Sequence, residues 1–264
     1  MDNNFNKISW NGKGLEIADL QFVLERYKKQ KDVESFILFK DKIILSEYEK
    51  YFATYTGQVN NILEIGMWDG GSMALWYELL KPEKIVGIDI EDKKDNEYFI
   101  KWKNDRLTKD NSLIKTFWNI NQANKTALLD ICKSELENNI DMIIDDASHV
   151  YDYTLASFET LFPLLKPGGI YIIEDWAWLH WKELVHYFPK GQGLSKLIYE
   201  VIQSLGSTEK LINSVTVYHG FAVIEKGEKE ISENFKLQDY IYLPKYKKRK
   251  FKQRIQAGIK AFLK

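Results

Sequence analysis

Short runs of β-branched and other apolar residues alternate with amphipathic stretches along most of the chain. The runs predict strands over 61–65, 84–88, 115–120, 141–144 and 169–173. Between them, apolar residues at three- and four-residue spacing predict helices over 72–80, 124–138 and 151–165. This alternation is typical of βαβ units, in which parallel strands are joined by right-handed crossovers.

Two further apolar runs, over 214–218 and 221–225, meet at His219 and Gly220, which predicts a turn between antiparallel strands. With this pair as the antiparallel edge, the pattern predicts a doubly wound, Rossmann-like α/β fold. Its mostly parallel sheet has seven strands, with helices on both faces. The first 58 residues are predicted to be mainly helical, because apolar residues recur at helical spacing over 15–28 and 44–55.

The chain is therefore divided into a helical segment over 1–58 that caps the site, a Rossmann-like domain over 59–228 and a C-terminal extension over 229–264. Residues 244–264 hold nine Lys or Arg and no acid, so residues 1–243 are acidic. An acidic body with a basic tail argues against a nucleic-acid binder. The tail also has an apolar helical face, formed by Phe251, Ile255, Ile259 and Phe262. A helix that packs on its own domain or on a second copy is favoured over one that contacts a membrane surface or a partner.

No apolar run is long enough to cross a bilayer, and the first residues have no basic segment followed by an apolar one. The single cysteine, Cys132, cannot form an intrachain disulfide, and its apolar neighbours in a predicted helix indicate an inert thiol. These features predict a cytoplasmic protein.

A glycine-containing turn, Glu64-Ile65-Gly66-Met67-Trp68-Asp69-Gly70-Gly71-Ser72, follows the first predicted strand of the sheet. It resembles motif I of class I S-adenosylmethionine-dependent methyltransferases, in which small residues let the backbone pass close to a ligand at the mouth of the next helix. The position two after Gly66 is Trp68, so the turn lacks the dinucleotide fingerprint G-x-G-x-x-G. The resemblance implies S-adenosylmethionine as cofactor and contacts from Glu64, Gly66, Trp68, Asp69, Gly70 and Ser72.

Asp89 ends the second predicted strand of the sheet, 23 residues after Gly66. A carboxylate at this place can accept both hydroxyls of a ribose. The next strand ends at Asn121 and Gln122, which resemble the polar pair near the adenine in related enzymes. All three residues are assigned to the cofactor.

Two neighbouring strands end in adjacent acids, Asp145–Asp146 and Glu174–Asp175. The carboxyl ends of parallel strands share one crevice, where four carboxylates would repel one another unless a cation neutralised them. Oxygen ligands of this kind suit Mg²⁺ or Mn²⁺. His149 follows Asp146 by three residues and can accept a proton near neutral pH.

The order Asp-Asp-x-Ser-His, then Lys-Pro-Gly-Gly and Ile-Glu-Asp resembles the Mg-dependent sugar O-methyltransferases of macrolide biosynthesis and the rhamnosyl and cephalosporin hydroxylase-like groups, over about residues 58–180. The resemblance implies that Asp146, Glu174 and Asp175 are the metal ligands and that His149 is the catalytic base. Asp145 is assigned to the cofactor. The sequence departs from the family at Asn121, where an aspartate is frequent.

Three tryptophans follow Asp175, and two interpretations of them stay open. They either stack on a sugar or aromatic acceptor or form a hydrophobic lid, with Gly191–Gln192–Gly193 as its hinge. Trp176, Trp178 and His180 are the candidate substrate contacts, and His180 and His186 are secondary candidates for the base. His219 is placed in the late strand pair.

Together these residues predict a divalent-metal-dependent O-methyltransferase that uses S-adenosylmethionine and acts on a hydroxyl of a sugar or sugar-bearing metabolite. Its acceptor is a small molecule or a glycan, and a homo-oligomer is compatible with the sequence. Two alternatives stay open: a metal-independent small-molecule methyltransferase, and a non-catalytic module that binds the cofactor or a partner.

Overall fold

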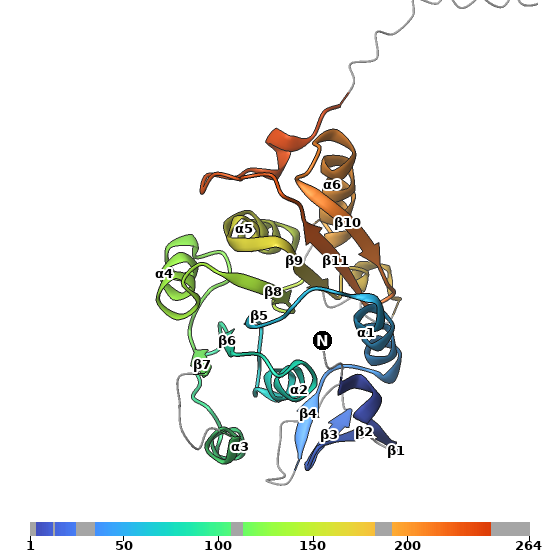
Figure 1. The fold of residues 1–264 in the computed structure, drawn as a ribbon, viewed down its shortest axis with the longest axis vertical. Coiled ribbons are helices and arrows are strands. Elements are labelled where there is room, and N and C mark those ends of the chain that lie inside the picture. Colours follow the sequence, from blue (N-terminus) through green and yellow to red (C-terminus); the bar gives the residue numbers. More distant parts are fainter. Residues whose placement is uncertain (1–3, 13, 25–34, 107–112, 183–191, 244–264) are drawn as a thin grey trace, which may run out of the picture.

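The computed structural model describes residues 4–12, 14–24, 35–106, 113–182 and 192–243. A seven-stranded sheet in the order β10-β11-β9-β8-β5-β6-β7 forms its centre (Figure 1). The five strands from β9 to β7 are parallel, and β11 and β10 are antiparallel at one edge. Their bounds are β5 Asn61–Ile65, β6 Lys84–Ile88, β7 Ile114–Phe117, β8 Ile140–Asp145, β9 Leu165–Glu174, β10 Ile212–Val217 and β11 Phe221–Lys226.

The predicted fold class is confirmed, because the inner parallel strands are buried on both faces. All six residues of β8 are buried, and so are the last four of both β5 and β6. Strands that are buried on both faces have nearly continuous apolar sequences, and this pattern allowed them to be predicted. The strand predicted over 115–120 is β7, which runs from Ile114 to Phe117 and so ends three residues earlier than predicted.

Helices cover both faces of the sheet (Figure 1). One face packs against α1 (Lys42–Thr54), α2 (Gly71–Leu80) and α3 (Glu97–Arg106), and the other against α4 (Lys125–Leu136), α5 (Tyr151–Leu161) and α6 (Leu194–Ser207). The aromatic rings of Tyr48 on α1 and Phe221 on β11 stack with centroids 3.9 Å apart. Helix α1 is thereby fixed above the antiparallel edge.

The helices expected over 72–80 and 124–138 are confirmed as α2 and α4. The helix expected over 151–165 ends earlier, since α5 gives way at Leu161 to a short 3₁₀ turn, Phe162–Leu164, that contains Pro163. A proline lacks the amide N–H that a longer α-helix would need. Helices α3 and α6 were not predicted from the sequence. The basic tail lies outside the described residues.

The helical prediction for residues 15–28 is wrong as far as the structure describes them. Strands β2 (Gly14–Ile17) and β3 (Leu20–Leu24) form a tight hairpin here, within a four-stranded sheet that also holds β1 (Ser9–Asn11) and β4 (Phe36–Leu38). Ile17 and Leu20 flank the two-residue turn, and Ala18 there has a left-handed φ of 54°. Their spacing of three residues imitates a helix, although the apolar residues alternate within each strand. The helix expected over 44–55 is confirmed as α1.

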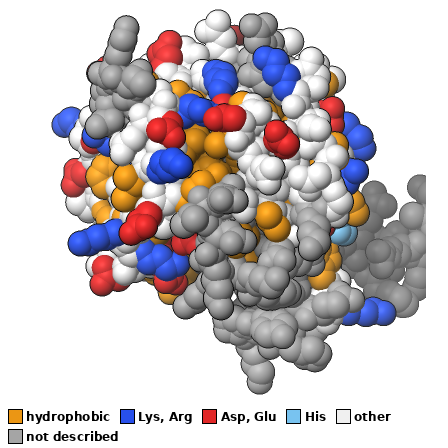
Figure 2. Space-filling model, turned by 90° about the horizontal axis from the view of Figure 1, so that it is seen from below, with side chains coloured by type: hydrophobic (Ala, Val, Ile, Leu, Met, Phe, Trp, Pro, Cys, Tyr) orange, Lys and Arg blue, Asp and Glu red, His pale blue; other side chains and the backbone are white. Residues whose placement is uncertain are grey.

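The small sheet shares one hydrophobic core with the main sheet, since Leu15, Phe22 and Phe36 belong to the same buried cluster as Ile85. The division of the chain at residues 58 and 228 stays a prediction. On the face seen in Figure 2, basic and acidic side chains are interspersed, unlike the one-signed surface of a nucleic-acid binder. Within the described residues, none of the helices has both the length and the apolar character needed to cross a bilayer.

Candidate functional site

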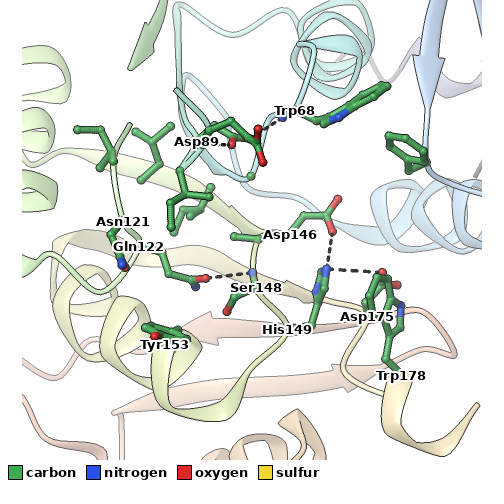
Figure 3. Close-up of a pocket in the computed structure, with 18 of the residues that line it drawn as sticks. Trp68, Asp89, Asn121, Gln122, Asp146, Ser148, His149, Tyr153, Asp175 and Trp178 are labelled. Atoms are coloured by element: carbon green, nitrogen blue, oxygen red, sulfur yellow. Dashed lines mark hydrogen bonds and ion pairs between the residues drawn. The ribbon is translucent and has the colours of Figure 1, made fainter. Parts of the chain in front are cut away.

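A cavity of about 510 Å³ opens at the carboxyl ends of β5, β6, β8 and β9. The direction of strand addition reverses beside β5, and parallel α/β sheets bind ligands at such a reversal. Figure 3 shows that polar side chains from several strand ends point into this space. We call the part around Asp89 and Trp68 the Asp89 end, and the part around Asp146, His149 and Asp175 the Asp146 end.

The glycine turn after β5 brings two strand ends into contact. Gly66 has a φ of +87°, and a Cβ added there would lie 2.2 Å from the backbone oxygen of Asp146. Only glycine allows β5 to end this close to β8. Trp68 also has a left-handed backbone, with a φ of 47°, and its indole contacts the ring of Phe39 at a centroid distance of 4.2 Å. The turn therefore presents an aromatic side chain at the edge of the cavity, where both rings line it.

Asp89 is oriented by backbone donors from its own surroundings. The amide of Trp68 donates to Oδ2 at 2.8 Å and the amide of Glu91 donates to Oδ1 at 2.9 Å. A carboxylate offers about four acceptor sites, so each oxygen can still accept a further hydrogen bond. Asp89 lines the cavity, although only 7% of it is exposed. The arrangement fits the two adjacent hydroxyls of a ribose.

The two residues of the predicted pair after β7, Asn121 and Gln122, differ in burial. Gln122 is buried and accepts a hydrogen bond from the amide of Ser148 at 3.0 Å, whereas Asn121 is exposed and caps the amide of Ala123. Both line the cavity. Asp145 lies behind Gln122, where it accepts hydrogen bonds from Gln122, Ser157 and Tyr171, and it does not line the cavity.

At the Asp146 end, three possible metal ligands face one another. His149 Nε2 is 3.9 Å from Asp146 Oδ1 and 4.0 Å from Asp175 Oδ2 (Figure 3). One donor atom from each residue lies within 4.8 Å of the others. His149 and Asp175 have left-handed φ values of 53° and 55°. Non-glycine residues pay for that conformation, and such strain is concentrated at functional sites.

The imidazole of His149 is largely buried against the indole of Trp178, with ring centroids 4.1 Å apart. Burial lowers the pKa of His149 to about 4, although the nearby Glu174 carboxylate acts in the opposite direction. The ring is therefore neutral near pH 7 and has a lone pair with which to take a proton or bind a metal.

Ionisation of Asp175 is unfavourable in this environment. Burial, together with the charges of Asp146 and Glu174, raises its pKa to about 8, while Lys40 and a hydrogen bond with Trp178 act to lower it. The excess of negative charge is what a divalent cation would relieve. The donor set of the Asp146 end therefore fits such an ion.

Glu174, the third predicted ligand, is turned away from the cavity and has two protein partners. Lys40 Nζ donates to Glu174 Oε2 at 2.5 Å and to Asp146 Oδ2 at 2.7 Å, and the hydroxyl of Tyr48 donates to Glu174 Oε1 at 2.7 Å. Only 4% of Lys40 is exposed. Burial favours the neutral amine, but the attraction of Asp146 and Glu174 outweighs it and raises the pKa of Lys40.

Sequence reasoning missed Lys40 and Tyr48. Lys40 lies between β4 and α1, more than 100 residues from both of its acidic partners. The only local signal was a lysine directly after the four apolar residues 36–39. Tyr48 was interpreted only as one of the apolar positions of the helix predicted over 44–55.

The other predicted site residues are divided between the cavity and its surroundings. Trp178 lines the cavity, but Trp176 and His180 do not. Trp176 donates a hydrogen bond to the backbone oxygen of Tyr218 at 2.9 Å and so packs against the strand pair. The residues outside the lining also include Glu64, Asp69, Gly70 and Ser72 of the turn. His186 and Gly191 lie outside the described residues. Trp181, the last of the three tryptophans after Asp175, also lines the cavity, and lining residues that were not predicted include Phe39 and Tyr153.

The turn, the Asp89 strand end and the Asp146 end all fall within a stretch that matches a known family. Residues 63–176 match a family described as a methyltransferase domain. Over this stretch, which is less than half of the chain, the protein is similar to methyltransferases. The matched stretch runs from β5 to just beyond β9 and so contains every strand end of the seven-stranded sheet that contributes to the cavity.

Curated relatives of this chain are named as O-methyltransferases. Demethylmacrocin O-methyltransferase of Streptomyces fradiae is 29% identical over 206 residues, 68% of this chain and 47% of the relative. Mycinamicin VI 2''-O-methyltransferase of Micromonospora griseorubida is 29% identical, over 69% of this chain and 48% of its own length. The chain thus spans about half the length of these relatives.

A solved structure with a similar fold is the MycE methyltransferase from the mycinamycin biosynthetic pathway, in complex with Mg and SAH. It is 29% identical, and the superposition covers 70% of this chain and 49% of that one, with a TM-score of 0.52. The predicted resemblance to the sugar O-methyltransferases is confirmed at this level.

Proposed function

We propose that the protein is an S-adenosylmethionine-dependent O-methyltransferase that uses a divalent cation and methylates a hydroxyl of a sugar or sugar-bearing metabolite. One observation carries the proposal. A single cavity has a ribose-type carboxylate, Asp89, at one end and a histidine between two carboxylates at the other. That is what a transfer between a nucleoside-bearing donor and a hydroxyl acceptor requires. The relatives named above support the same conclusion.

S-Adenosylmethionine would lie across the Asp89 end and supply an electrophilic methyl group on its sulfonium. Asp89 would accept the ribose hydroxyls while the Trp68 and Glu91 amides keep its carboxylate in place. Gln122, which accepts a hydrogen bond from the Ser148 amide, would lie beside the adenine of the cofactor. Because the Asp89 carboxylate is already ordered before the cofactor binds, less conformational entropy is lost on binding.

A divalent cation would be held by Asp146 and Asp175, the two predicted ligands that line the cavity, and would supply a Lewis acid that lowers the pKa of a bound hydroxyl. Mg²⁺ prefers oxygen ligands, which leaves His149 Nε2 free to act as a base. Glu174, whose oxygens contact Lys40 and Tyr48, is the remaining predicted ligand.

His149 would take the hydroxyl proton at Nε2 as the acceptor oxygen bonds to the methyl carbon and the carbon–sulfur bond breaks. Its lowered pKa keeps the ring neutral over the whole neutral range, so that its lone pair is available, and the neighbouring carboxylates of Asp146 and Asp175 would stabilise the imidazolium as it forms. Trp178 fixes the plane of the imidazole. Tyr153, Trp178 and Trp181 give the cavity aromatic faces against which the apolar side of a sugar ring can pack.

One observation favours metal-independent transfer as a second candidate. Lys40 already supplies a positive charge to both Asp146 and Glu174. In that case the carboxylates of the Asp146 end would bind hydroxyls of the acceptor directly.

The test is transfer of a labelled methyl group from S-adenosylmethionine to a panel of free and glycoside-bound deoxysugars. We expect product only with a sugar acceptor, loss of turnover in EDTA, and recovery with Mg²⁺ or Mn²⁺. Full activity after exhaustive chelation would support the metal-independent candidate. Cofactor binding without transfer to any acceptor would support a non-catalytic binding module.

A further inference from the structure

The turn between β10 and β11, residues 218–220, is fastened to the segment that follows β9. The amide of Asp175 donates a hydrogen bond to the backbone oxygen of Gly220 at 2.6 Å. The indole of Trp176 donates to the backbone oxygen of Tyr218 at 2.9 Å. Because the segment after β9 carries aromatic side chains of the cavity wall, the turn supports that wall from outside.

A third contact joins this turn to a side chain that lines the cavity. The imidazole of His219 stacks on the indole of Trp181, with ring centroids 5.2 Å apart and an angle of 21° between the ring planes. Trp181 lines the cavity, whereas His219 is exposed and does not line it. The imidazole therefore covers one face of the indole from outside the cavity. The methyl transfer proposed above gives His219 no part.

Of the three aromatic residues that the proposed function offers to a sugar ring, Trp181 has the fewest other contacts to serve. Trp178 packs on the imidazole of His149 at a centroid distance of 4.1 Å. Tyr153 lies on the side of Gln122, where the adenine would bind (Figure 3). The amide of Trp181 donates to the backbone oxygen of Trp178 at 3.0 Å, which keeps Trp181 on one turn with the neighbour of the proposed base.

We propose that His219 is a positioning residue of the acceptor site, which backs Trp181 so that the opposite face of its indole receives the sugar ring of the acceptor. The inference rests on the proposed function. One face of a pyranose ring presents C–H groups, and these pack against the negative face of an aromatic ring. An indole without backing would lose rotational freedom when the sugar binds, and this loss of entropy would weaken binding. Stacking on His219 orders the indole beforehand.

Replacing His219→Ala removes the stack and should raise KM for the acceptor about three- to tenfold, which is the contribution of one aromatic pair. Because the sugar is held equally in the ground state and the transition state, kcat should stay within about threefold of the wild type. KM for S-adenosylmethionine should not change. The acceptor probe is the deoxysugar glycoside that the wild type methylates best. Val217→Ala is the matched control, because Val217 is an exposed residue of the same hairpin, and its acceptor KM should equal that of the wild type. An unchanged acceptor KM in His219→Ala would overturn the inference.

The conservative variant His219→Phe tests whether the stacked ring is the part of His219 that matters. Phenylalanine keeps a flat ring but has no imidazole nitrogens, so the acceptor KM should return to within about twofold of the wild type. A Phe variant that is as impaired as the Ala variant would show that the nitrogens act through a hydrogen bond, which contradicts the inference.

A double-mutant cycle shows whether His219 acts through Trp181. Trp181→Leu removes the indole and should raise the acceptor KM at least about tenfold, because the whole stacking surface is lost. Adding His219→Ala to Trp181→Leu should then change KM by less than about twofold, since the imidazole has no indole left to order. A further rise as large as in the wild-type background would mean that His219 acts by another route, and the inference would be wrong.

Calorimetry in the presence of S-adenosylhomocysteine measures binding of the same glycoside without turnover. The affinity of His219→Ala for the glycoside should be about three- to tenfold lower than that of the wild type, and equal affinities would overturn the inference. A wild type that neither binds nor methylates any deoxysugar would contradict the proposed function, and the inference with it. A wild type that methylates a sugar with the same KM as His219→Ala would contradict the inference alone.

Discussion

The two ends of the cavity hold their carboxylates by different means. Asp89 is held by two backbone amides, both within 21 positions of it along the chain. At the Asp146 end, the contacts of Asp146 and Glu174 with Lys40 join positions 106 and 134 residues apart. One end is built by a local turn and the other by side chains that meet only in the folded protein. The Asp89 end should therefore tolerate changes elsewhere, whereas the Asp146 end depends on the packing of α1 and β4.

The largest expected effect is at His149. Replacing His149→Ala removes the proton acceptor and should lower kcat by roughly 10²- to 10⁴-fold, with cofactor affinity nearly intact. His149→Gln should be almost as slow, because it keeps a hydrogen-bonding side chain but has no basicity. His180→Ala is the control, since His180 is exposed and outside the cavity lining. A Gln variant with most of the wild-type activity would place the base elsewhere.

The acidic environment of Asp175 predicts a pH dependence for the metal. Asp175 has a pKa raised to about 8 by burial and by its acidic neighbours. A carboxyl group must lose its proton before it binds a cation, so Mn²⁺ affinity should rise up to tenfold per pH unit, by about 10²-fold from pH 6 to 8. Above pH 8 it should level off. Isothermal titration calorimetry measures the change, and equal affinities at pH 6 and 8 would contradict it.

At the Asp89 end the expected effect is smaller. Asp89→Ala removes the acceptor of the ribose hydroxyls and should weaken S-adenosylmethionine binding at least about tenfold in calorimetry. Mn²⁺ affinity should stay unchanged if the two ends are built independently. Asp92→Ala, a nearby exposed acid, is the matched control. Unchanged cofactor affinity in a folded Asp89→Ala protein would remove Asp89 from the site.

The smallest effect concerns Glu64, which lies behind the cavity near Lys40. Its side chain is fully buried, and burial raises its pKa to about 8. Between pH ~4.3 and 8 the folded protein keeps a proton that the unfolded chain releases, so stability should fall as pH rises through this window. Glu64→Gln has no proton to lose and should be about 1–3 kcal/mol more stable than the wild type at pH 8.5.

Urea denaturation at pH 5 and pH 8.5 measures this difference, which should shrink toward the acidic pH. Glu209→Gln is the control, because Glu209 is an exposed glutamate. Identical pH slopes for Glu64→Gln and the wild type would show that Glu64 is ionised in the folded protein.

The same contrast explains how much the sequence could predict. The strands that end in Gly66 and Asp89 carry their signal in a few adjacent residues, and both residues line the cavity. The acids of β8 and β9 were also found, because the carboxyl ends of parallel strands meet. Lys40 was missed because no local pattern connects it to acids more than 100 residues away. Asp145 and Glu64 were assigned to the cofactor, but both point into the protein, since neighbouring residues of a strand face opposite sides.

The position of Lys40 also matters for anyone who shortens or recombines this protein. A fragment that starts at residue 59, the predicted domain boundary, would contain every residue of the Asp146 end but would lose the ammonium and the tyrosine hydroxyl that neutralise its inner wall. A chimera that took its first 58 residues from a relative would inherit the counterion of that relative, or none. Exchange of the N-terminal segment is therefore an exchange of charge as well as of shape, and metal affinity would change with the donor of the segment.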